Sequence, residues 1–126
     1  MRFSLIMATY GRKAEIDTFL KSIEQQQYDT LKVEIIIVDQ NDKIVLDDIC
    51  VKYSNKLNIK HIKSDRKGLS FNRNIGLSSA IGEIIAFPDD DCTYYPETLV
   101  EVEDYFQNHD DVDVVLGKIY DRKIKK

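Results

Sequence analysis

The feature that most constrains the fold is an alternation of short apolar runs with amphipathic segments along the 126 residues. Residues 33–38 form a β-branched run that ends at Asp39, and residues 3–8 form a second apolar run. Runs of this kind are typical of strands buried on both faces of a sheet. Between the two runs, apolar residues follow the helical spacing i, i+3, i+4, i+7. They are Ile16, Phe19, Leu20 and Ile23.

The same alternation continues along the chain and predicts the fold class. We expect helices over residues 13–27, 44–53, 69–80 and 96–106, and strands over residues 3–8, 33–38, 59–62, 83–87 and 112–116. Gly82 follows the third helix, where glycine often ends a helix in the left-handed conformation. Pro88 ends the fourth strand because it lacks a backbone donor. The order predicts an α/β domain with a mostly parallel, Rossmann-like sheet flanked by helices.

Length, net charge and hydropathy limit the number of domains and the kinds of partner that the chain can have. A chain of 126 residues fits one domain or part of one. A net charge of −4 argues against nucleic-acid binding through a broad basic surface, and we interpret the basic residues between 118 and 126 as a solvated end. No apolar run reaches the roughly 18–20 residues of a membrane span. We expect a cytoplasmic location, which leaves open attachment to the inner face of a membrane through the rest of a longer protein.

Several common catalytic and binding motifs do not occur. Cys50 and Cys92 lack the spacing of a zinc site or of a disulfide framework. His61 and His109 are isolated, and we interpret both as structural. Neither GxGxxG nor GxxxxGK[ST] is present, which disfavours a dinucleotide-binding Rossmann domain and a P-loop.

The topology predicts where a ligand binds. In an open parallel sheet, ligands bind outside the carboxyl ends of the strands, near the point where the strand order reverses. Residues 9–12 follow the first expected strand, residues 39–42 follow the second, and Asp89, Asp90 and Asp91 follow the fourth. We therefore expect the functional site among these three segments.

The three consecutive aspartates are the most informative of these segments. Neighbouring carboxylates repel one another, so either their pKa values rise or a cation neutralises them. Oxygen ligands suit Mg²⁺ or Mn²⁺, which typically takes one or two carboxylates and completes its shell with water and phosphate oxygens. The run from Asp89 to Asp91 is therefore suited to hold a diphosphate through a cation. The alternative is an acidic turn that caps the following helix.

Two other segments offer nucleotide contacts, each with a structural alternative. Asp39 can accept a hydrogen bond from a base N–H or a ribose hydroxyl, or it can close its strand in an Asx-turn. Residues 65–74 bring basic side chains to the start of a helix, where cations and free N–H groups suit an anionic ligand. Their alternative is a helix N-cap with an exposed polar face.

Taken together, these segments resemble the family 2 glycosyltransferases of the GT-A fold. The resemblance is carried by residues 4–12, 35–39, 68–77 and 80–91, and it extends over nearly the whole chain. It implies that Thr9 and Tyr10 line the base pocket, that Asp39 binds the base edge, commonly uracil, and that Arg73 approaches the nucleotide.

The resemblance also implies roles for the aspartate run. Asp89 and Asp91 correspond to the outer members of the DxD motif, and Asp91 is the best candidate ligand for Mg²⁺ or Mn²⁺. Asp90 lies between them, near the ribose. The metal then stabilises the departing nucleoside diphosphate as a Lewis acid.

The sequence departs from the family pattern in its length. Family members have longer catalytic domains, whose later part supplies acceptor contacts and a carboxylate general base. Asp110, Asp111 and Asp113 come too early for that base. We therefore expect residues 1–126 to be the donor-binding part of a domain truncated at its C-terminus, with no catalytic residue identified and the base beyond residue 126.

The leading hypothesis is a metal-assisted, inverting glycosyltransferase that uses a nucleoside diphosphate sugar, with UDP as the expected nucleotide, and a glycan or lipid-linked acceptor. One alternative is a nucleotide-sugar-binding module without transferase activity. A receiver-type signalling domain is disfavoured, because it requires its acidic pair after the first strand, where Thr9 and Tyr10 stand.

Overall fold

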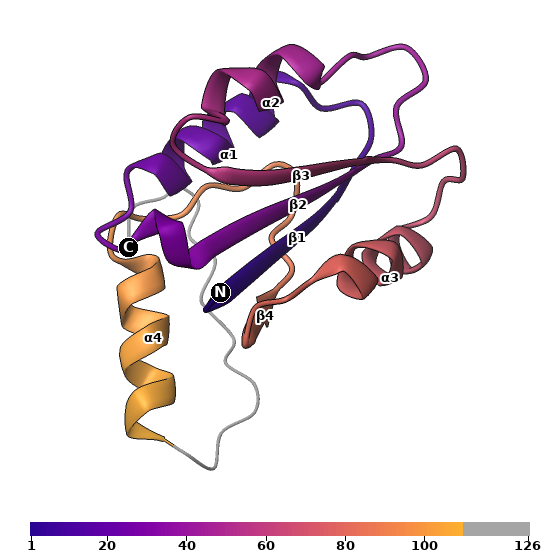
Figure 1. Ribbon diagram of the computed structural model, residues 1–126. Coiled ribbons are helices and arrows are strands. Elements are labelled where there is room, and N and C mark those ends of the chain that lie inside the picture. The colour runs from indigo at the N-terminus through magenta and orange to yellow at the C-terminus, as the bar shows by residue number, and fades with distance from the viewer. Residues whose placement is uncertain (110–126) are drawn as a thin grey trace, which may run out of the picture.

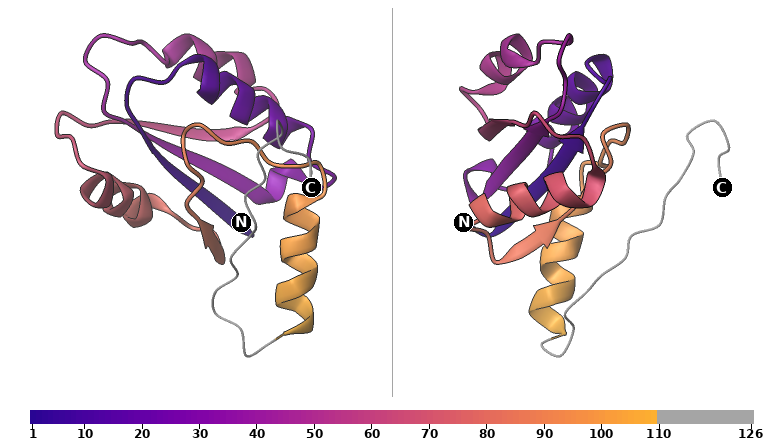
Figure 2. Two further views of the ribbon diagram at one scale, coloured as in Figure 1. Left: turned by 180° about the vertical axis from the view of Figure 1, so that it is seen from behind. Right: turned by 90° about the vertical axis from the view of Figure 1, so that its right-hand side faces the viewer.

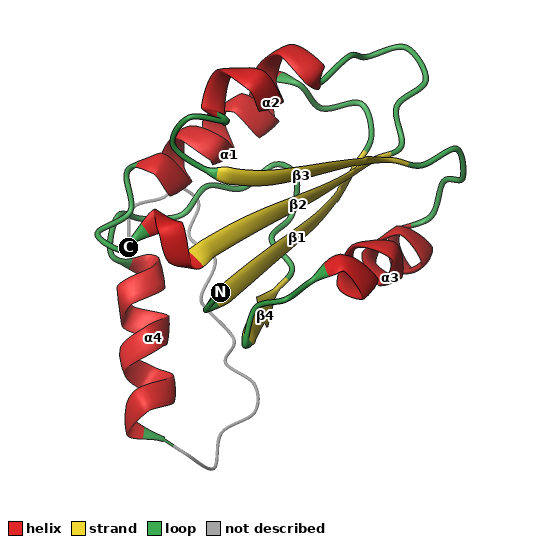
Figure 3. Ribbon diagram, in the orientation of Figure 1, coloured by secondary structure: helices red, strands yellow, loops and turns green. Residues whose placement is uncertain are grey.

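A computed structural model describes residues 1–109, in which strands and helices alternate as expected (Figures 1 and 3). The strands are β1 (Phe3–Thr9), β2 (Val33–Asp39), β3 (Asn58–Lys63) and β4 (Ile84–Ala86). The helices are α1 (Ala14–Glu24), the 3₁₀ turn η1 (Thr30–Lys32), α2 (Asp47–Tyr53), α3 (Leu69–Ser79) and α4 (Thr98–Asn108). The expected strand over residues 112–116 and the basic end lie outside the described residues.

Within residues 1–109 the sheet is parallel throughout and has the strand order β3-β2-β1-β4. The chain therefore moves from β1 outward to β3 and then crosses back to place β4 on the other side of β1. Helix α3 lies on the opposite face of the sheet from α1 and α2 (Figure 2). This arrangement confirms the predicted α/β fold and puts the reversal of strand order between β1 and β4.

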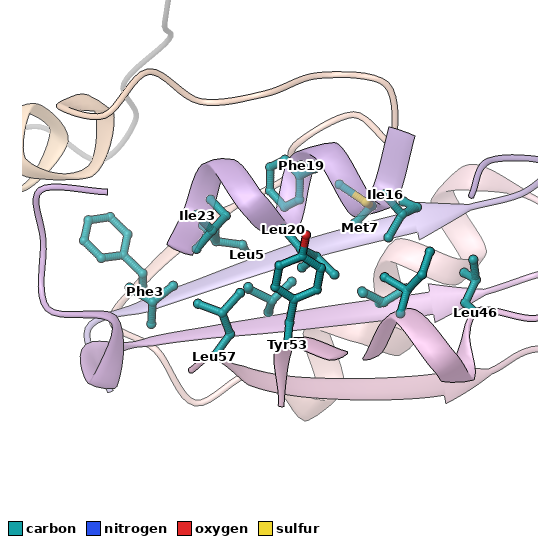
Figure 4. Packing of buried hydrophobic residues seen from close by; sticks show 14 of the residues in the cluster. Phe3, Leu5, Met7, Ile16, Phe19, Leu20, Ile23, Leu46, Tyr53 and Leu57 are labelled. Carbon is teal, nitrogen blue, oxygen red and sulfur yellow. The ribbon is translucent and has the colours of Figure 1, made fainter. Parts of the chain in front are cut away.

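The core lies mainly between the sheet and helices α1 and α2. All four apolar residues of the predicted helical stripe are fully buried, among them Phe19 and Leu20. They pack against alternate residues of β1 and β2, such as Leu5 and Ile35. Tyr53 of α2 and Leu57, which precedes β3, belong to the same buried cluster (Figure 4). Because successive strand residues point to opposite faces, the residues between them, including Ile6, face α3 instead.

Of the three apolar residues that suggested a helix here, Phe71, Ile75 and Leu77, only Ile75 packs on the sheet, against Ile6, Ile36 and Val38; the fully buried residues of α3 are small or polar. Phe71 and Leu77 are 38% and 45% exposed, whereas Asn72 and Gly76 are buried. A Cβ at Gly76 would lie only 2.4 Å from Ile6 Cγ2, so the helix can approach the sheet this closely only because the residue is glycine. The apolar residues of this segment therefore identified the packed face only through Ile75.

Gly82 also has a role different from the one predicted. Helix α3 ends at Ser79, its C-cap residue Ala80 is extended with φ −75°, and Gly82 does not have positive φ. Instead, a Cβ at Gly82 would lie 2.5–2.7 Å from atoms of Ser4 and Phe3. The glycine is required by the close approach of the α3–β4 connection to β1.

The segment after β4 crosses over α1 before α4 begins. Tyr94 packs edge-on against Phe19, with 5.5 Å between ring centroids, and its N–H donates to Ser22 Oγ. Helix α4 begins at Thr98, two residues later than predicted, and Arg2 holds it through a bidentate contact with Glu103 (2.8–3.0 Å). None of the helices within residues 1–109 combines the length and apolar character needed to span a bilayer.

Candidate functional site

The carboxyl ends of three strands meet in one row at the edge of the sheet, on the right of Figure 1. Thr9 is the register partner of Asp39, and Asp39 is the register partner of Lys63. On the other side of β1, Thr9 Oγ1 donates a 3.0 Å hydrogen bond to Asp90 Oδ2. This bond spans the point where the strand order reverses, so the structure brings together the first, second and fourth strand ends that the sequence indicated.

Asp39 is fully buried at this edge, and both of its oxygens are occupied by protein donors. Oδ1 accepts from the backbone N–H (2.9 Å) and from Nδ2 (2.8 Å) of Asn41. Oδ2 lies 2.8 Å from His61 Nε2 and 3.1 Å from Lys63 Nζ. The bond to the Asn41 N–H is an Asx-turn, so that alternative for Asp39 is confirmed for one of its two oxygens.

These contacts set the charge state of Asp39. Burial by itself raises the pKa of the carboxyl group, but hydrogen bonds from Asn41, His61 and Lys63 outweigh burial and hold the pKa below its ordinary value. Asp39 is therefore an anion at neutral pH. The Lys63 side chain is 57% exposed, which makes it the one partner of Oδ2 that can swing into solvent.

Tyr10 and the loop after β1 form the open side of the site. Tyr10 is 50% exposed, and Lys67 Nζ lies 4.6 Å from the centre of its ring. Gly11 takes φ +73°, and its N–H donates a 2.7 Å hydrogen bond to Asn41 Oδ1. Asn41 therefore connects the loop after β1 to the Asp39 carboxylate at the end of β2.

The loop before α3 is held to the same edge. The Gly68 N–H donates to Gln40 Oε1 at 2.9 Å, and Asn72 Nδ2 donates to the carbonyls of Arg66 and Gly68. Gly68, with φ +139°, is the N-cap of α3 and has no side-chain cap. The polar residues of segment 65–74 therefore do not cap α3 with a side chain. Their contacts hold the loop before the helix instead.

The aspartate run contacts three different partners. The side chain of Asp90 is only 22% exposed and receives the bond from Thr9, whereas those of Asp89 and Asp91 are 65% and 57% exposed. Arg73 lies 3.6 Å from Asp89, and Arg12 lies 3.9 Å from Asp91. Because α4 starts only at Thr98 and has Glu97 as its N-cap, the alternative of a helix-capping acidic turn is wrong.

The donor chemistry of the run fits a hard divalent cation. Asp89 and Asp91 present exposed carboxylate oxygens, the ligands that Mg²⁺ and Mn²⁺ prefer. Among residues 1–109 no three His, Cys, Asp or Glu side chains group as a complete metal site. A cation here would therefore take one or two protein ligands and complete its shell with water and phosphate oxygens.

Several residues of the site were not among those selected from the sequence, and the four that contact Asp39 or the aspartate run directly are Arg12, Asn41, His61 and Lys63. Arg12 and Asn41 lie in the segments after β1 and β2, so the strand-end rule pointed to their segments without singling them out. Lys63 was missed because the third strand was expected to end at Ile62. His61 holds Asp39 in place, which is a structural role of the kind expected, although no sequence signal indicated its partner.

The two cysteines and His109 were also interpreted from the sequence, and the structure shows the surroundings of each. Both Cys50 and Cys92 are free thiols, and burial raises the pKa of each to about 11, so neither is an activated nucleophile. His109 stacks on Tyr105 at the end of α4, where its Nδ1 lies 2.9 Å from the Tyr105 carbonyl.

Comparison with known proteins identifies the relatives of the chain. The profile described as glycosyl transferase family 2 matches residues 4–126. The poly(ribitol-phosphate) β-N-acetylglucosaminyltransferase TarS of Staphylococcus aureus is 32% identical over 121 residues, which are 94% of this chain and 21% of TarS. The putative glycosyltransferase EpsH of Bacillus subtilis is 37% identical over 95 residues, 75% of this chain and 27% of EpsH. The chain thus spans about a fifth to a quarter of the length of these curated relatives.

Solved structures agree with the sequence matches. The structure of S. aureus TarS residues 1–349 in complex with UDP-GlcNAc superposes with a TM-score of 0.82 and 31% identity, covering 87% of this chain and 32% of that one. The mannosyltransferase PcManGT of Pyrobaculum calidifontis, solved with GDP-Man and Mn²⁺, gives a TM-score of 0.75 over 83% of this chain and 32% of its own, at 24% identity, and supports the fold alone.

Proposed function

The chain belongs to glycosyl transferase family 2, and on this premise we propose that it forms the donor-binding part of an enzyme that transfers a sugar from a nucleoside diphosphate sugar to a glycan or lipid-linked acceptor. The observation that carries the proposal is the hydrogen bond from Thr9 to Asp90. It joins the two strand ends at the reversal of strand order, which is where ligands bind in open α/β sheets.

The base would bind between Tyr10 and Asp39. The exposed ring of Tyr10 offers an apolar face for stacking, and the anionic Asp39 carboxylate accepts from a base N–H. Lys63 now occupies the accessible side of that carboxylate, so base binding requires the lysine side chain to move aside. We propose UDP as the nucleotide, since uracil presents an N–H between two carbonyls and the relative TarS was solved with UDP-GlcNAc.

The sugar diphosphate would lie over the aspartate run. Asp91, assisted by Asp89, would hold Mg²⁺ or Mn²⁺, and Asp90, fixed by Thr9, would face the ribose. When bound, the cation supplies Lewis-acid stabilisation of the negative charge on the leaving diphosphate. Arg73, 3.6 Å from Asp89 and 5.5 Å from the centre of the Phe87 ring, adds a fixed positive charge beside the same phosphates.

The transfer itself needs a base that removes the proton of the attacking hydroxyl as the anomeric centre inverts. Among residues 1–109, Asp39 and the three aspartates of the run are already assigned to the nucleotide or the cation. We propose that the base lies beyond residue 126 in a longer protein, whose remaining part binds the acceptor.

Isothermal titration of the 126-residue chain with UDP tests the proposal. We expect binding in Mn²⁺ and much weaker binding in EDTA, with ADP weaker than UDP in both. Asp91→Asn should remove the Mn²⁺ dependence, whereas the matched control Asp104→Asn, on the exposed surface of α4, should bind as the parent chain does. If neither UDP nor any other nucleoside diphosphate binds in either condition, the proposed function is wrong.

A second assay distinguishes binding from turnover. The 126-residue chain should bind UDP-sugar and transfer none of it to an added glycan, while the longer protein should transfer it. Transfer by the short chain at a normal enzymatic rate would contradict the assignment of the base to a later segment. Binding without transfer even by the longer protein would instead identify a nucleotide-sugar-binding module.

A further inference from the structure

Arg12 occupies a position in the site that the proposed function does not yet use. It follows Gly11, whose positive φ turns the chain back toward the sheet edge and whose N–H is held by Asn41. The guanidinium group then lies near three carboxylates at once: 3.6 Å from Glu15, 3.7 Å from Asp90 and 3.9 Å from Asp91. The loop therefore directs this one cation at the aspartate run.

The contacts of Arg12 are electrostatic and loose. Hydrogen bonds from nitrogen to oxygen measure about 2.7–3.2 Å, and all three distances of Arg12 are longer. The side chain is 43% exposed, and exposed ion pairs of this kind are weak and easily rearranged. Arg73 differs, because its guanidinium also lies against the Phe87 ring. Arg12 thus neutralises Asp90 and Asp91 without being fixed to either.

A divalent cation at Asp91 would change this balance. Two positive groups cannot share one carboxylate without repulsion, so the guanidinium of Arg12 must leave Asp91 as the metal arrives. Its planar array of donors matches two phosphate oxygens better than a point charge does. The diphosphate of the donor would lie beside the metal, within reach of the released side chain.

We propose that Arg12 exchanges partners during donor binding: it neutralises Asp90 and Asp91 when no nucleotide is present, and it binds the diphosphate when the metal and the nucleotide are in place. This inference rests on the proposed function. It makes Arg12 a competitor of the free metal and a ligand of the metal–nucleotide complex, so its removal should affect the two affinities in opposite directions.

The test measures both affinities on the 126-residue chain. Free Mn²⁺, followed by its electron paramagnetic resonance signal, should bind Arg12→Gln several-fold more tightly than the parent chain. UDP in the presence of saturating Mn²⁺ should bind the same variant about tenfold more weakly, the usual effect of losing a charge-assisted hydrogen-bonded pair. Arg12→Lys keeps the positive charge but loses the planar pair of guanidinium donors. Its Mn²⁺ affinity should match that of the parent chain, and its UDP affinity should lie between those of the parent chain and Arg12→Gln.

A neighbouring residue provides the matched control. Lys13→Gln removes the same charge from the same loop, but Lys13 pairs with Asp48 at 3.1 Å rather than with the aspartate run. It should change the affinity for Mn²⁺ and for UDP in Mn²⁺ by less than about twofold, as expected of a distant exposed charge. Thermal unfolding of each variant checks that the fold is retained, since both side chains are substantially exposed.

The outcomes separate this inference from the proposed function. Weaker or unchanged Mn²⁺ binding by Arg12→Gln would overturn the competition, and unchanged UDP binding would overturn the exchange. A parent chain that binds no UDP would contradict the proposed function and the diphosphate contact together. In that case the Mn²⁺ affinities of the parent chain and of Arg12→Gln would still decide whether Arg12 competes with the metal.

Discussion

Strand β2 carries a buried carboxylate near each end, and the two differ in what surrounds them. Glu34, near the amino end, is 1% exposed; its Oε2 accepts from Ser4 Oγ and from the Ile81 N–H at 2.7 Å, and its Oε1 forms an ion pair with Lys60 Nζ at 2.9 Å. Asp39, at the carboxyl end, is fully buried and accepts hydrogen bonds on both of its oxygens. Burial raises both pKa values, and the hydrogen bonds outweigh it in both cases.

The difference lies in the neighbours. Glu34 is enclosed where the α3–β4 connection presses on β1, with Gly82 against Ser4. Both carboxylates have a partly exposed lysine partner, but Asp39 also shares the site edge with the exposed Tyr10 and with the aspartate run, which its register partner Thr9 contacts. A buried carboxylate with a lowered pKa is therefore not in itself a sign of a functional site. The exposed, adaptable groups around it make the distinction, and the following experiments test that view.

The largest effect is expected at the closed end. Gly82→Ala places a Cβ within 2.5–2.7 Å of Ser4 and Phe3, including backbone atoms that cannot move aside. We expect the free energy of unfolding to fall by about 3 kcal/mol, measured by urea denaturation. Gly11→Ala is the control at the open end: its Cβ would contact nothing within 4 Å, and only the left-handed conformation costs about 1 kcal/mol. Equal losses would show that the two ends are equally closed.

Replacing each carboxylate by its amide compares the two ends directly. Glu34→Gln and Asp39→Asn each leave buried donors without their charged acceptor, so each should lower the free energy of unfolding by about 2 kcal/mol. Only Asp39→Asn should also weaken UDP binding, about tenfold, when titrated under conditions where both variants are folded. A loss of UDP binding in Glu34→Gln at retained fold would remove the distinction drawn here.

The pH dependence of stability should come from both ends. The folded-state pKa of Glu34 and of Asp39 lies below the unfolded value. Their contribution is therefore fully present above the unfolded pKa of about 4 and is lost as the pH falls through the folded pKa. We expect the urea midpoint of the parent chain to fall between pH 6 and pH 3, and that of the Glu34→Gln, Asp39→Asn double variant to fall less. If the urea midpoint of the double variant falls as steeply with pH as that of the parent chain, the acid sensitivity comes from other carboxylates with lowered pKa values, such as Asp17 and Glu103.

The smallest effect on stability is expected at the exposed aspartates. Asp91→Asn should change the free energy of unfolding by less than about 0.5 kcal/mol, since the side chain is 57% exposed and makes no close hydrogen bond in the structure. The same variant should lose Mn²⁺-dependent UDP binding, as described for the titration above. A marked loss of stability would mean that the run supports the fold instead of a ligand.

Much of this fold could be predicted from local patterns. The β-branched run of β2 and the helical stripe of α1 identified the two central layers, because burial on a flat sheet and on a cylinder requires those periodicities. Element ends were less accurate, as in α2, which begins at Asp47 rather than at residue 44. The packed face of α3 was harder to predict. Its close contact with the sheet depends on Gly76, and the need for glycine there is visible only once the fold places Ile6 against it.

The candidate site likewise has a part that the sequence predicted and a part that only the tertiary structure determined. The sequence alone placed Thr9, Asp39 and the aspartate run at strand ends, because a parallel α/β sheet brings all carboxyl ends to one edge. Only the tertiary structure decided that Thr9 bonds Asp90, that His61 and Lys63 cover Asp39, and that Arg12 faces the aspartates. These contacts join residues 22 to 81 positions apart, and side-chain direction and reach across strands are set by packing, which no local pattern encodes.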